Sequence, residues 1–196
     1  DHRDLHLSLR RQRQMCIRDR NNIRYGSGVL FYCKSLDNTP YFFLGKDKDN
    51  RWSNFGGGVE LSDKCDPENT ASRETWEETL GCIGDMVDIK KIIKNSHCII
   101  SKTPSGNKYY MYIVKIPFSN VYRDRFISTK KFLSNISSDK KFLEIVDVKL
   151  LSLETIKYSI DDSNKRTFIK LRSSFEKTVQ DNFNEIYKLI NSKNNY

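Results

Sequence analysis

The spacing of hydrophobic side chains predicts a sheet that forms early in the chain and resumes late. Residues 26–34 and 41–46 are rich in β-branched and aromatic side chains, a composition that is typical of strands. The turn-forming sequence Asp-Asn-Thr-Pro at residues 37–40 separates them, so we predict a β-hairpin. Further strand-like runs follow at residues 86–93, 98–102, 109–116 and 143–151.

Two other segments carry the signals of helices. The sequence Asp-Pro-Glu at residues 66–68 is a strong helix start, because it combines a capping acid, a proline at the first helical position and an acid at the positive end of the helix dipole. This helix should end near Leu80, before Gly81. At residues 166–190 apolar side chains recur every three or four positions, which predicts one amphipathic helix of about seven turns. A shorter helix is expected around residues 130–135.

These elements predict the fold class. Strands interrupted by one central and one terminal helix indicate an α/β protein, with an α/β/α sandwich around a mixed β-sheet. We assign residues 21–160 to one domain, and residues 161–196 to a C-terminal helix that packs on it and ends in a frayed tail. Residues 1–20 use arginine and no lysine, whereas lysine dominates afterwards. Since this segment also resembles adapter-derived sequence, we interpret it as a non-native or disordered extension.

The composition narrows the class of protein. The 196 residues are 37% hydrophobic and 30% charged, as in soluble globular proteins, and no apolar run approaches the roughly 20 residues that span a bilayer. The five cysteines include no C-x-x-C pair, which argues against a zinc ribbon and against a disulfide framework. We therefore expect an intracellular, cytoplasmic protein.

The charge of the chain suits polyanionic partners. The formal net charge is +9, but lysine is interleaved with Asp, Glu and Asn almost everywhere instead of forming one basic block. This pattern favours a solvated basic surface over a dedicated nucleic-acid patch.

The candidate chemistry lies on the central helix. In the sequence Arg-Glu-Thr-Trp-Glu-Glu at residues 73–78, Glu74 and Glu78 are one helical turn apart and Glu77 lies beside them. Like charges this close repel by about a few tenths of a kcal/mol per pair, so a bound cation would stabilise them. Hard oxygen donors select Mg²⁺, Mn²⁺ or Ca²⁺ over zinc. The alternative is a solvated helix face with an ion pair between Arg73 and Glu77.

The sequence around this helix resembles the Nudix hydrolase family. Residues 57–82 are similar to the family motif G-x5-E-x7-R-E-U-x-E-E-x-G-U, in which U is a bulky apolar residue, and the resemblance covers about residues 26–160. There are departures from the motif. Asp63 stands at the position of the first glutamate, and the loop before Arg73 has two added residues. Thr75 takes an apolar position, and Leu80 is an extra residue before the last glycine.

The resemblance implies roles for individual residues. It makes Glu77 and Glu78 the main ligands of Mg²⁺, for which Mn²⁺ could substitute. It makes Glu74 a ligand or the general base and Arg73 the residue that orients the acids. The carbonyl group of Gly56 is implied as a further metal ligand.

Other candidates depend on weaker signals. Some family members carry an additional glutamate on a late loop, and Glu144 is our candidate for it, although a solvated strand-edge residue is the alternative. Glu60 is a candidate for a position near the ions. Aromatic side chains beside the glycine turn could stack on a base or belong to the core. The candidate substrate-binding residues are Trp52, Phe55, Gly57 and Gly58.

Three functions remain open at this point. The resemblance favours a metal-dependent hydrolase that cleaves the pyrophosphate bond of a nucleoside diphosphate linked to another moiety, with a small nucleotide as substrate. A messenger-RNA decapping enzyme is the second reading, which the net charge slightly favours and the lack of a separate RNA-binding domain disfavours. The third is an inactive nucleotide-sensing module, against which the presence of Glu74, Glu77 and Glu78 argues. No membrane partner is expected.

Overall fold

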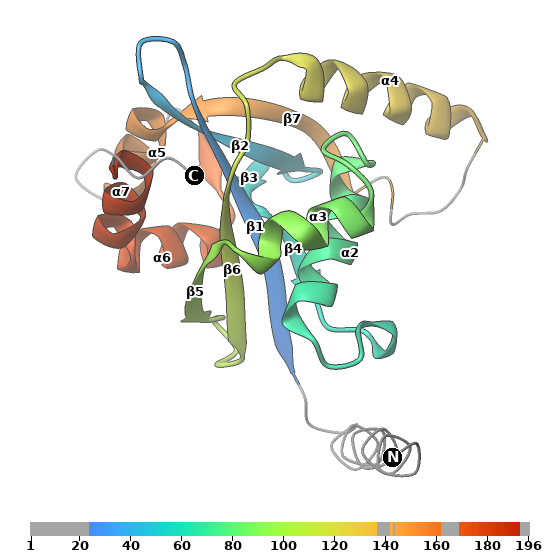
Figure 1. Ribbon diagram of the computed structural model, residues 1–196, viewed down its shortest axis with the longest axis horizontal. Coiled ribbons are helices and arrows are strands. Elements are labelled where there is room, and N and C mark those ends of the chain that lie inside the picture. Colours follow the sequence, from blue (N-terminus) through green and yellow to red (C-terminus); the bar gives the residue numbers. More distant parts are fainter. Residues whose placement is uncertain (1–23, 137–141, 143, 162–168, 193–196) are drawn as a thin grey trace, which may run out of the picture.

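A mixed sheet lies between two groups of helices in the computed structural model, which describes residues 24–136, 142, 144–161 and 169–192 (Figure 1). The extension assigned to residues 1–20 lies outside the described residues. The strands are β1 (Tyr25–Lys34), β2 (Pro40–Asp47), β3 (Arg51–Ser53), β4 (Phe55–Gly58), β5 (His97–Lys102), β6 (Lys108–Lys115), β7 (Ile145–Ser152) and β8 (Lys170–Leu171). The helices are α2 (Pro67–Thr79), α3 (Met86–Lys94), α4 (Val121–Ile136), α5 (Leu153–Ile160), α6 (Ser173–Asp181) and α7 (Phe183–Asn191).

The strand β1 organises the sheet. It runs parallel to β6 along one edge, and along the other edge it pairs antiparallel with β4 and then with β2. The sheet order is β5-β6-β1-β2-β3-β8, and β7 pairs with the free edge of β2. The predicted hairpin and the predicted mixed sheet are therefore confirmed.

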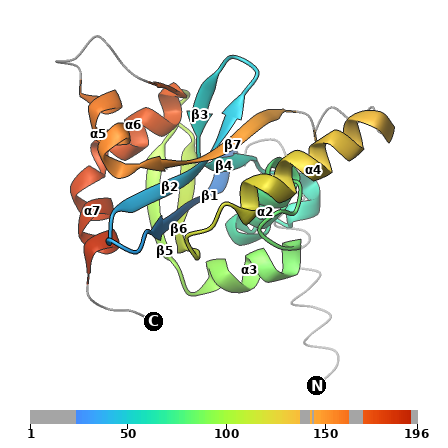
Figure 2. The ribbon, with the colours of Figure 1, turned by 90° about the horizontal axis from the view of Figure 1, so that it is seen from above.

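Alternation along β1 divides the core into two layers. Val29, Phe31 and Cys33 face the cluster that α2, α3 and α4 cover, whereas Leu30 belongs to the cluster under α5, α6 and α7. Figure 2 shows the same two groups of helices on opposite faces of the sheet. Because successive side chains of a strand point to opposite faces, a strand covered on both faces must be apolar throughout. The predicted α/β/α sandwich is confirmed.

One predicted strand is wrong. Residues 86–93 belong to helix α3, whose Ile89 and Ile93 are fully buried one turn apart. Asp85 caps this helix by accepting a hydrogen bond from the backbone N–H of Asp88 at 2.8 Å. The apolar run suggested a strand because its many isoleucines favour one, but the spacing of the two buried positions and the acidic cap are helical signals.

The C-terminal region also differs from its prediction. In place of one helix over residues 166–190, residues 170–171 form the short strand β8, and two helices follow. The break falls at Asn182, whose side-chain amide donates to the backbone carbonyl of Thr178 at 2.8 Å. Such a local side-chain bond competes with the helical ladder. Both helices nevertheless pack on the sheet, through Phe175, Val179, Ile186 and Ile190. Residues 166–168 lie outside the described part of the chain.

Helix α4 is longer than the helix predicted there, and a further helix, α5, follows β7. The short helix predicted around residues 130–135 lies within α4, which extends over Val121–Ile136 and buries Phe126. Helix α5 was not predicted, and it begins where Ser152 accepts a hydrogen bond from the N–H of Thr155 at 3.1 Å. Within the described ranges, no helix is long and apolar enough to cross a membrane.

Close contact between β1 and β4 depends on glycine at residue 28. A Cβ atom on Gly28 would lie 2.2 Å from the carbonyl oxygen of Phe55, 2.5 Å from the hydroxyl of Tyr109 and 2.7 Å from the Cα of Gly56. Two of these atoms belong to the backbone, so they cannot move aside without opening the sheet. A Cβ atom on Gly58, in contrast, would meet no atom within 4 Å.

We expect Gly28→Ala to lower the free energy of unfolding by about 3 kcal/mol or more, because an overpacked core must shift its backbone. Gly58→Ala is the matched control, since it makes the same chemical change in open space, and it should alter this free energy by less than about 1 kcal/mol. Urea denaturation followed by circular dichroism measures both values. Equal losses in the two variants would contradict the close packing.

Candidate active site

Helix α2 carries the candidate residues, and it begins and ends as predicted. Asp66 caps it by accepting from the N–H of Glu68 at 2.9 Å, Pro67 is its first residue, and it ends at Leu80, which has a left-handed backbone. The buried face of α2 is formed largely by small or polar side chains. These side chains let the helix lie close to the sheet, and its acids face the three glycines of β4. The glycines form an extended strand paired with β1 in place of the predicted turn.

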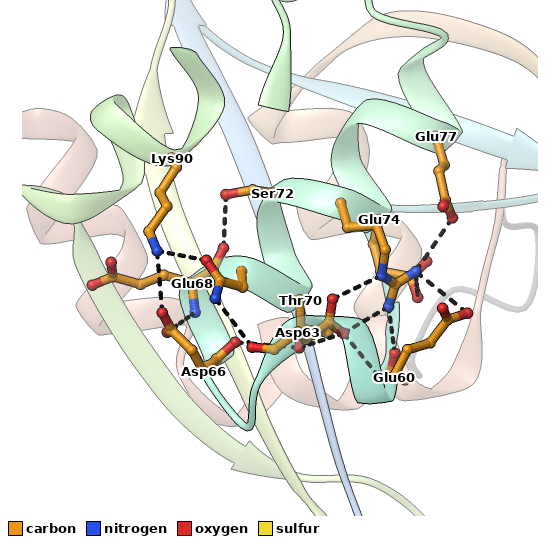
Figure 3. A network of polar contacts seen from close by, with 12 residues as sticks. Glu60, Asp63, Asp66, Glu68, Thr70, Ser72, Glu74, Glu77 and Lys90 are labelled. Carbon is orange, nitrogen blue, oxygen red and sulfur yellow. Dashed lines mark hydrogen bonds and ion pairs between the residues drawn. The ribbon is translucent and has the colours of Figure 1, made fainter. Parts of the chain in front are cut away.

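The guanidinium group of Arg73 is the centre of a buried polar network beside this helix. Figure 3 shows the acids Asp63, Glu74 and Glu77 of this network. Its Nε and Nη2 donate to the two carboxylate oxygens of Asp63, each at 2.9 Å, and Nη2 also donates to the carbonyl oxygen of Gly58 at 2.9 Å. Its Nη1 lies 2.9 Å from Glu74 and 3.3 Å from Glu77. A single arginine therefore connects strand β4, the loop and two helix acids.

Asp63, which departs from the motif glutamate, performs a clear structural task. It binds Arg73 in bidentate geometry and accepts from the N–H of Glu60 at 2.8 Å and from the hydroxyl of Thr70 at 3.0 Å. Burial would raise the pKa of Asp63, but these donors outweigh it and lower the pKa. The loop with the two added residues turns back through left-handed Lys64 and Cys65, so the added length leaves the pairing with Arg73 intact.

Glu78 is the most deeply buried of the helix acids. Its side chain accepts a hydrogen bond from the backbone N–H of Gly56 at 2.7 Å, and the residue is 7% exposed. Burial raises the pKa of Glu78 to about 8, against the opposing effect of the Gly56 donor, and the charge of Glu74 raises it further. Burial also raises the pKa of Glu74, which Arg73 partly offsets. Ionisation of either carboxyl group therefore costs free energy, and a nearby cation would lower this cost.

The acids converge on one cavity of about 240 Å³, which we call the acidic pocket. Five carboxylate side chains and two guanidinium groups line it, together with the three glycines of β4. If all are ionised, the five negative and two positive charges leave a net charge of −3. The carboxylates are Glu60, Glu74, Glu77, Glu78 and Glu144, and the cations are Arg73 and Arg172.

Two lining residues come from distant parts of the chain. Glu144, the weak candidate from the late loop, is exposed and lies at this pocket. Arg172 was not predicted, and it reaches the pocket because β8 pairs with β3 and the N–H of Arg172 donates to the carbonyl of Trp52 at 2.9 Å. Nothing in the sequence around Arg172 marks it, since its position depends on this strand pairing.

The donor set fits a hard divalent cation. It consists of carboxylate oxygens and a peptide carbonyl, which suit Mg²⁺ or Mn²⁺, and the pocket has an excess of negative charge. Among the residues that the structure describes, no three His, Cys, Asp or Glu side chains are arranged around a common ion position. The reason is visible in the contacts: Arg73 holds Glu74 and Glu77, and the Gly56 amide holds Glu78.

The two aromatic candidates for base stacking belong to the core. Phe55 is fully buried and packs on Phe31 and Phe43, with ring centroids 6.1 Å and 5.5 Å away. Trp52 is 8% exposed, and the ammonium group of Lys46 lies 5.6 Å from its ring centroid. Neither ring offers a free face to a base, so the core alternative describes both.

The glycine candidates do line the site. Gly57 and Gly58 border the acidic pocket. A Cβ atom on Gly57 would lie 2.5 Å from the carboxylate of Glu74, so only glycine lets this acid approach the turn.

Comparison with known proteins identifies the fold. No family model and no curated protein sequence matches the chain. The NUDIX domain of Shewanella oneidensis NrtR, solved with ADP ribose, matches with a TM-score of 0.50 and 10% identity, over 83% of this chain and 87% of that chain. A Nudix hydrolase from M. smegmatis, RenU, matches with a TM-score of 0.49 and 11% identity, over 87% and 90%. The first of these likenesses shows that the chain has the Nudix fold.

The raised pKa of Glu78 predicts how stability depends on pH. Its folded-state pKa of about 8 exceeds the usual value of 4.5, so between these values the folded state binds more protons than the unfolded chain. Without divalent ions, the free energy of unfolding should therefore fall as pH rises from about 5 to about 8, by at most about 1.4 kcal/mol per unit from this group.

Glu78→Gln cannot ionise and should lack this component, so its profile should be flatter across the same range. Urea denaturation in EDTA at several pH values measures both proteins. Parallel profiles would show that Glu78 titrates at an ordinary pKa.

Proposed function

We propose that the chain is a hydrolase that cleaves the pyrophosphate bond of a nucleoside diphosphate linked to another moiety, with Mg²⁺ held by Glu74, Glu77 and Glu78. The observation that carries this proposal is the convergence of these acids, from one helix, on a pocket that the three glycines of β4 also line. The Nudix fold is compatible with it, and the helix acids match the motif that the sequence resembles.

The acids and the metal have separate tasks in this proposal. Glu78, Glu77 and Glu74 are the residues that would hold the ion, with the Gly56 carbonyl and Glu144 as further oxygen donors at the same pocket. A bound divalent ion supplies neutralisation of the phosphate oxygens and lowers the pKa of water. Mn²⁺ would serve the same donors.

The protein's own groups orient the reaction. Arg73 holds the carboxylates of Glu74 and Glu77 at one side of the pocket. Glu74 is the candidate general base, because burial raises its pKa and a base is most effective when its pKa lies near the working pH. The glycine backbone gives the phosphates a close approach, and Arg172 brings a positive charge to the same pocket.

A small nucleotide is the favoured substrate. The acidic pocket is compact at about 240 Å³, and the NrtR domain of the same fold was solved with ADP ribose, a molecule of the proposed class. Capped messenger RNA remains the second candidate, which the net charge of +9 favours. An inactive sensing module would not need the set of carboxylates around the pocket.

Neutralising Glu78 should abolish most of the activity. We expect Glu78→Gln to lower turnover at saturating Mg²⁺ by about 100-fold or more, since metal ions contribute several kcal/mol to such transition states. Glu68→Gln is the matched control, because it removes one acid from the same helix outside the pocket. Chromatography of nucleotide products measures turnover, and circular dichroism confirms folding. Equal turnover by Glu78→Gln and the parent would exclude the metal assignment.

The two substrate classes differ in their response to salt. We expect a capped oligonucleotide and its isolated cap dinucleotide to show similar kcat/KM and similar salt dependence, because the chain lacks one continuous basic block. Recognition of the RNA beyond the cap would instead steepen the logarithmic salt slope by about 0.7 for each phosphate contacted. Titration of monovalent salt at fixed free Mg²⁺ measures both slopes, and a clearly steeper slope for the oligonucleotide would favour decapping.

A further inference from the structure

A second cavity of about 440 Å³ lies beside the acidic pocket and has the opposite charge. Its wall includes three cationic side chains, and its described lining includes no carboxylate. We call it the basic pocket. It shares the glycines of β4 and the side chain of Arg172 with the acidic pocket. The three cations are Arg24, Lys102 and Arg172.

Strand pairing brings these cations together from three distant parts of the sequence. Arg24 directly precedes β1, where Tyr25 is paired with Lys108 of β6. Lys102 ends β5 opposite the same Lys108. Arg172 lies between β8 and α6, next to β3. The basic pocket therefore lies where β1, the β5–β6 hairpin and α6 meet.

The cations of the basic pocket differ from Arg73 in their surroundings. Arg73 is buried and forms ion pairs with several acids. Within the described part of the chain, Arg24 and Lys102 form no ion pair, whereas Arg172 also faces the carboxylates of the acidic pocket. Since protein cations without partners attract anions from solution, this cavity is suited to a negatively charged group.

Neutral polar groups complete the lining. The side chain of Asn54 is buried and donates to the hydroxyl of Tyr109 at 2.8 Å, which fixes both at the floor of the cavity. Hydroxyl and amide side chains from the β5–β6 hairpin and from α6 add hydrogen-bonding groups: Thr103, Ser105, Asn107, Ser174 and Thr178. The volume lies within the range of about 300–1,000 Å³ that is usual for small-molecule sites.

We propose that the basic pocket binds a phosphate of the substrate that is remote from the pyrophosphate bond to be cleaved. The proposal rests on the hydrolase function proposed for the acidic pocket, and it names a narrower substrate class: nucleotides with an additional phosphate on the part that extends past Arg172. Arg172 lines both pockets. One substrate molecule can therefore extend past Arg172, with the bond to be cleaved in the acidic pocket and the remote phosphate in the basic pocket. The volume of about 440 Å³ suits a small nucleotide.

Binding without metal tests this inference separately from hydrolysis. Calorimetry in EDTA would compare adenosine 2′,5′-bisphosphate and 3′,5′-bisphosphate with AMP and with ADP, which has two phosphates on one chain. We expect at least one bisphosphate to bind about tenfold more tightly than ADP, because only a separated second phosphate can reach the cations of the basic pocket and gain charge-assisted hydrogen bonds there. ADP binding as tightly as both bisphosphates would overturn the claim that the phosphate is remote.

Three variants locate the effect. Arg24→Gln and Lys102→Gln change exposed side chains and should each reduce the preference for the bisphosphate by about tenfold. Lys188→Gln removes the same charge from α7, outside the cavity, and should keep the preference. A preference that survives in Arg24→Gln and Lys102→Gln would overturn the assignment to this pocket. A single-stranded oligonucleotide whose affinity rises with length would overturn the small-molecule class. Failure of hydrolysis in Mg²⁺ would contradict the proposed function alone.

Discussion

The buried ion pair between Arg73 and Asp63 is the interaction on which the candidate site depends. It joins the loop before α2 to the helix, and the same guanidinium group binds the carbonyl of Gly58 and two helix acids. A buried arginine without such partners would be costly, and removing one partner of a buried pair is strongly destabilising. The positions of Glu74 and Glu77 therefore follow from the buried positive charge of Arg73, which the fold must neutralise. The same polar network stabilises the fold and positions the acids of the site.

The three glycines of strand β4 give this network its place in the sheet. The Gly56 amide donates to Glu78, and Gly57 allows Glu74 to approach the backbone. The same glycines line both the acidic pocket and the basic pocket. A polyphosphate carries negative charge that neither a purely acidic nor a purely apolar cavity could hold. The proposed function and the proposed remote-phosphate site together would place a metal ion at one end of a substrate and an anionic group at the other.

Local signals predicted most of the fold, and failed where two signals competed. The β-branched and aromatic composition of β1 and the capping sequence before α2 each indicate one structure, so these elements were predicted correctly. The run that forms α3 is rich in isoleucine, which favours a strand, although its buried positions are one helical turn apart. At Asn182 a side-chain bond to the backbone interrupts a helix whose apolar spacing continues without a break. Periodicity alone does not report such a bond.

The sequence by itself determined the helix that carries the acids and its cap, because neighbours within one helix have a geometry set by the backbone. It marked the three glycines as a turn, and the pairing with β1 made them the strand β4. It left the surroundings of Trp52 and Phe55 open, and the packing of the sheet decided that both rings belong to the core. Only the tertiary structure placed Glu144 and Arg172 at the acidic pocket and gathered Arg24 and Lys102 beside it. The reason is that strand pairing, such as that of β3 with β8, joins residues far apart in the chain, and no local pattern encodes those distances.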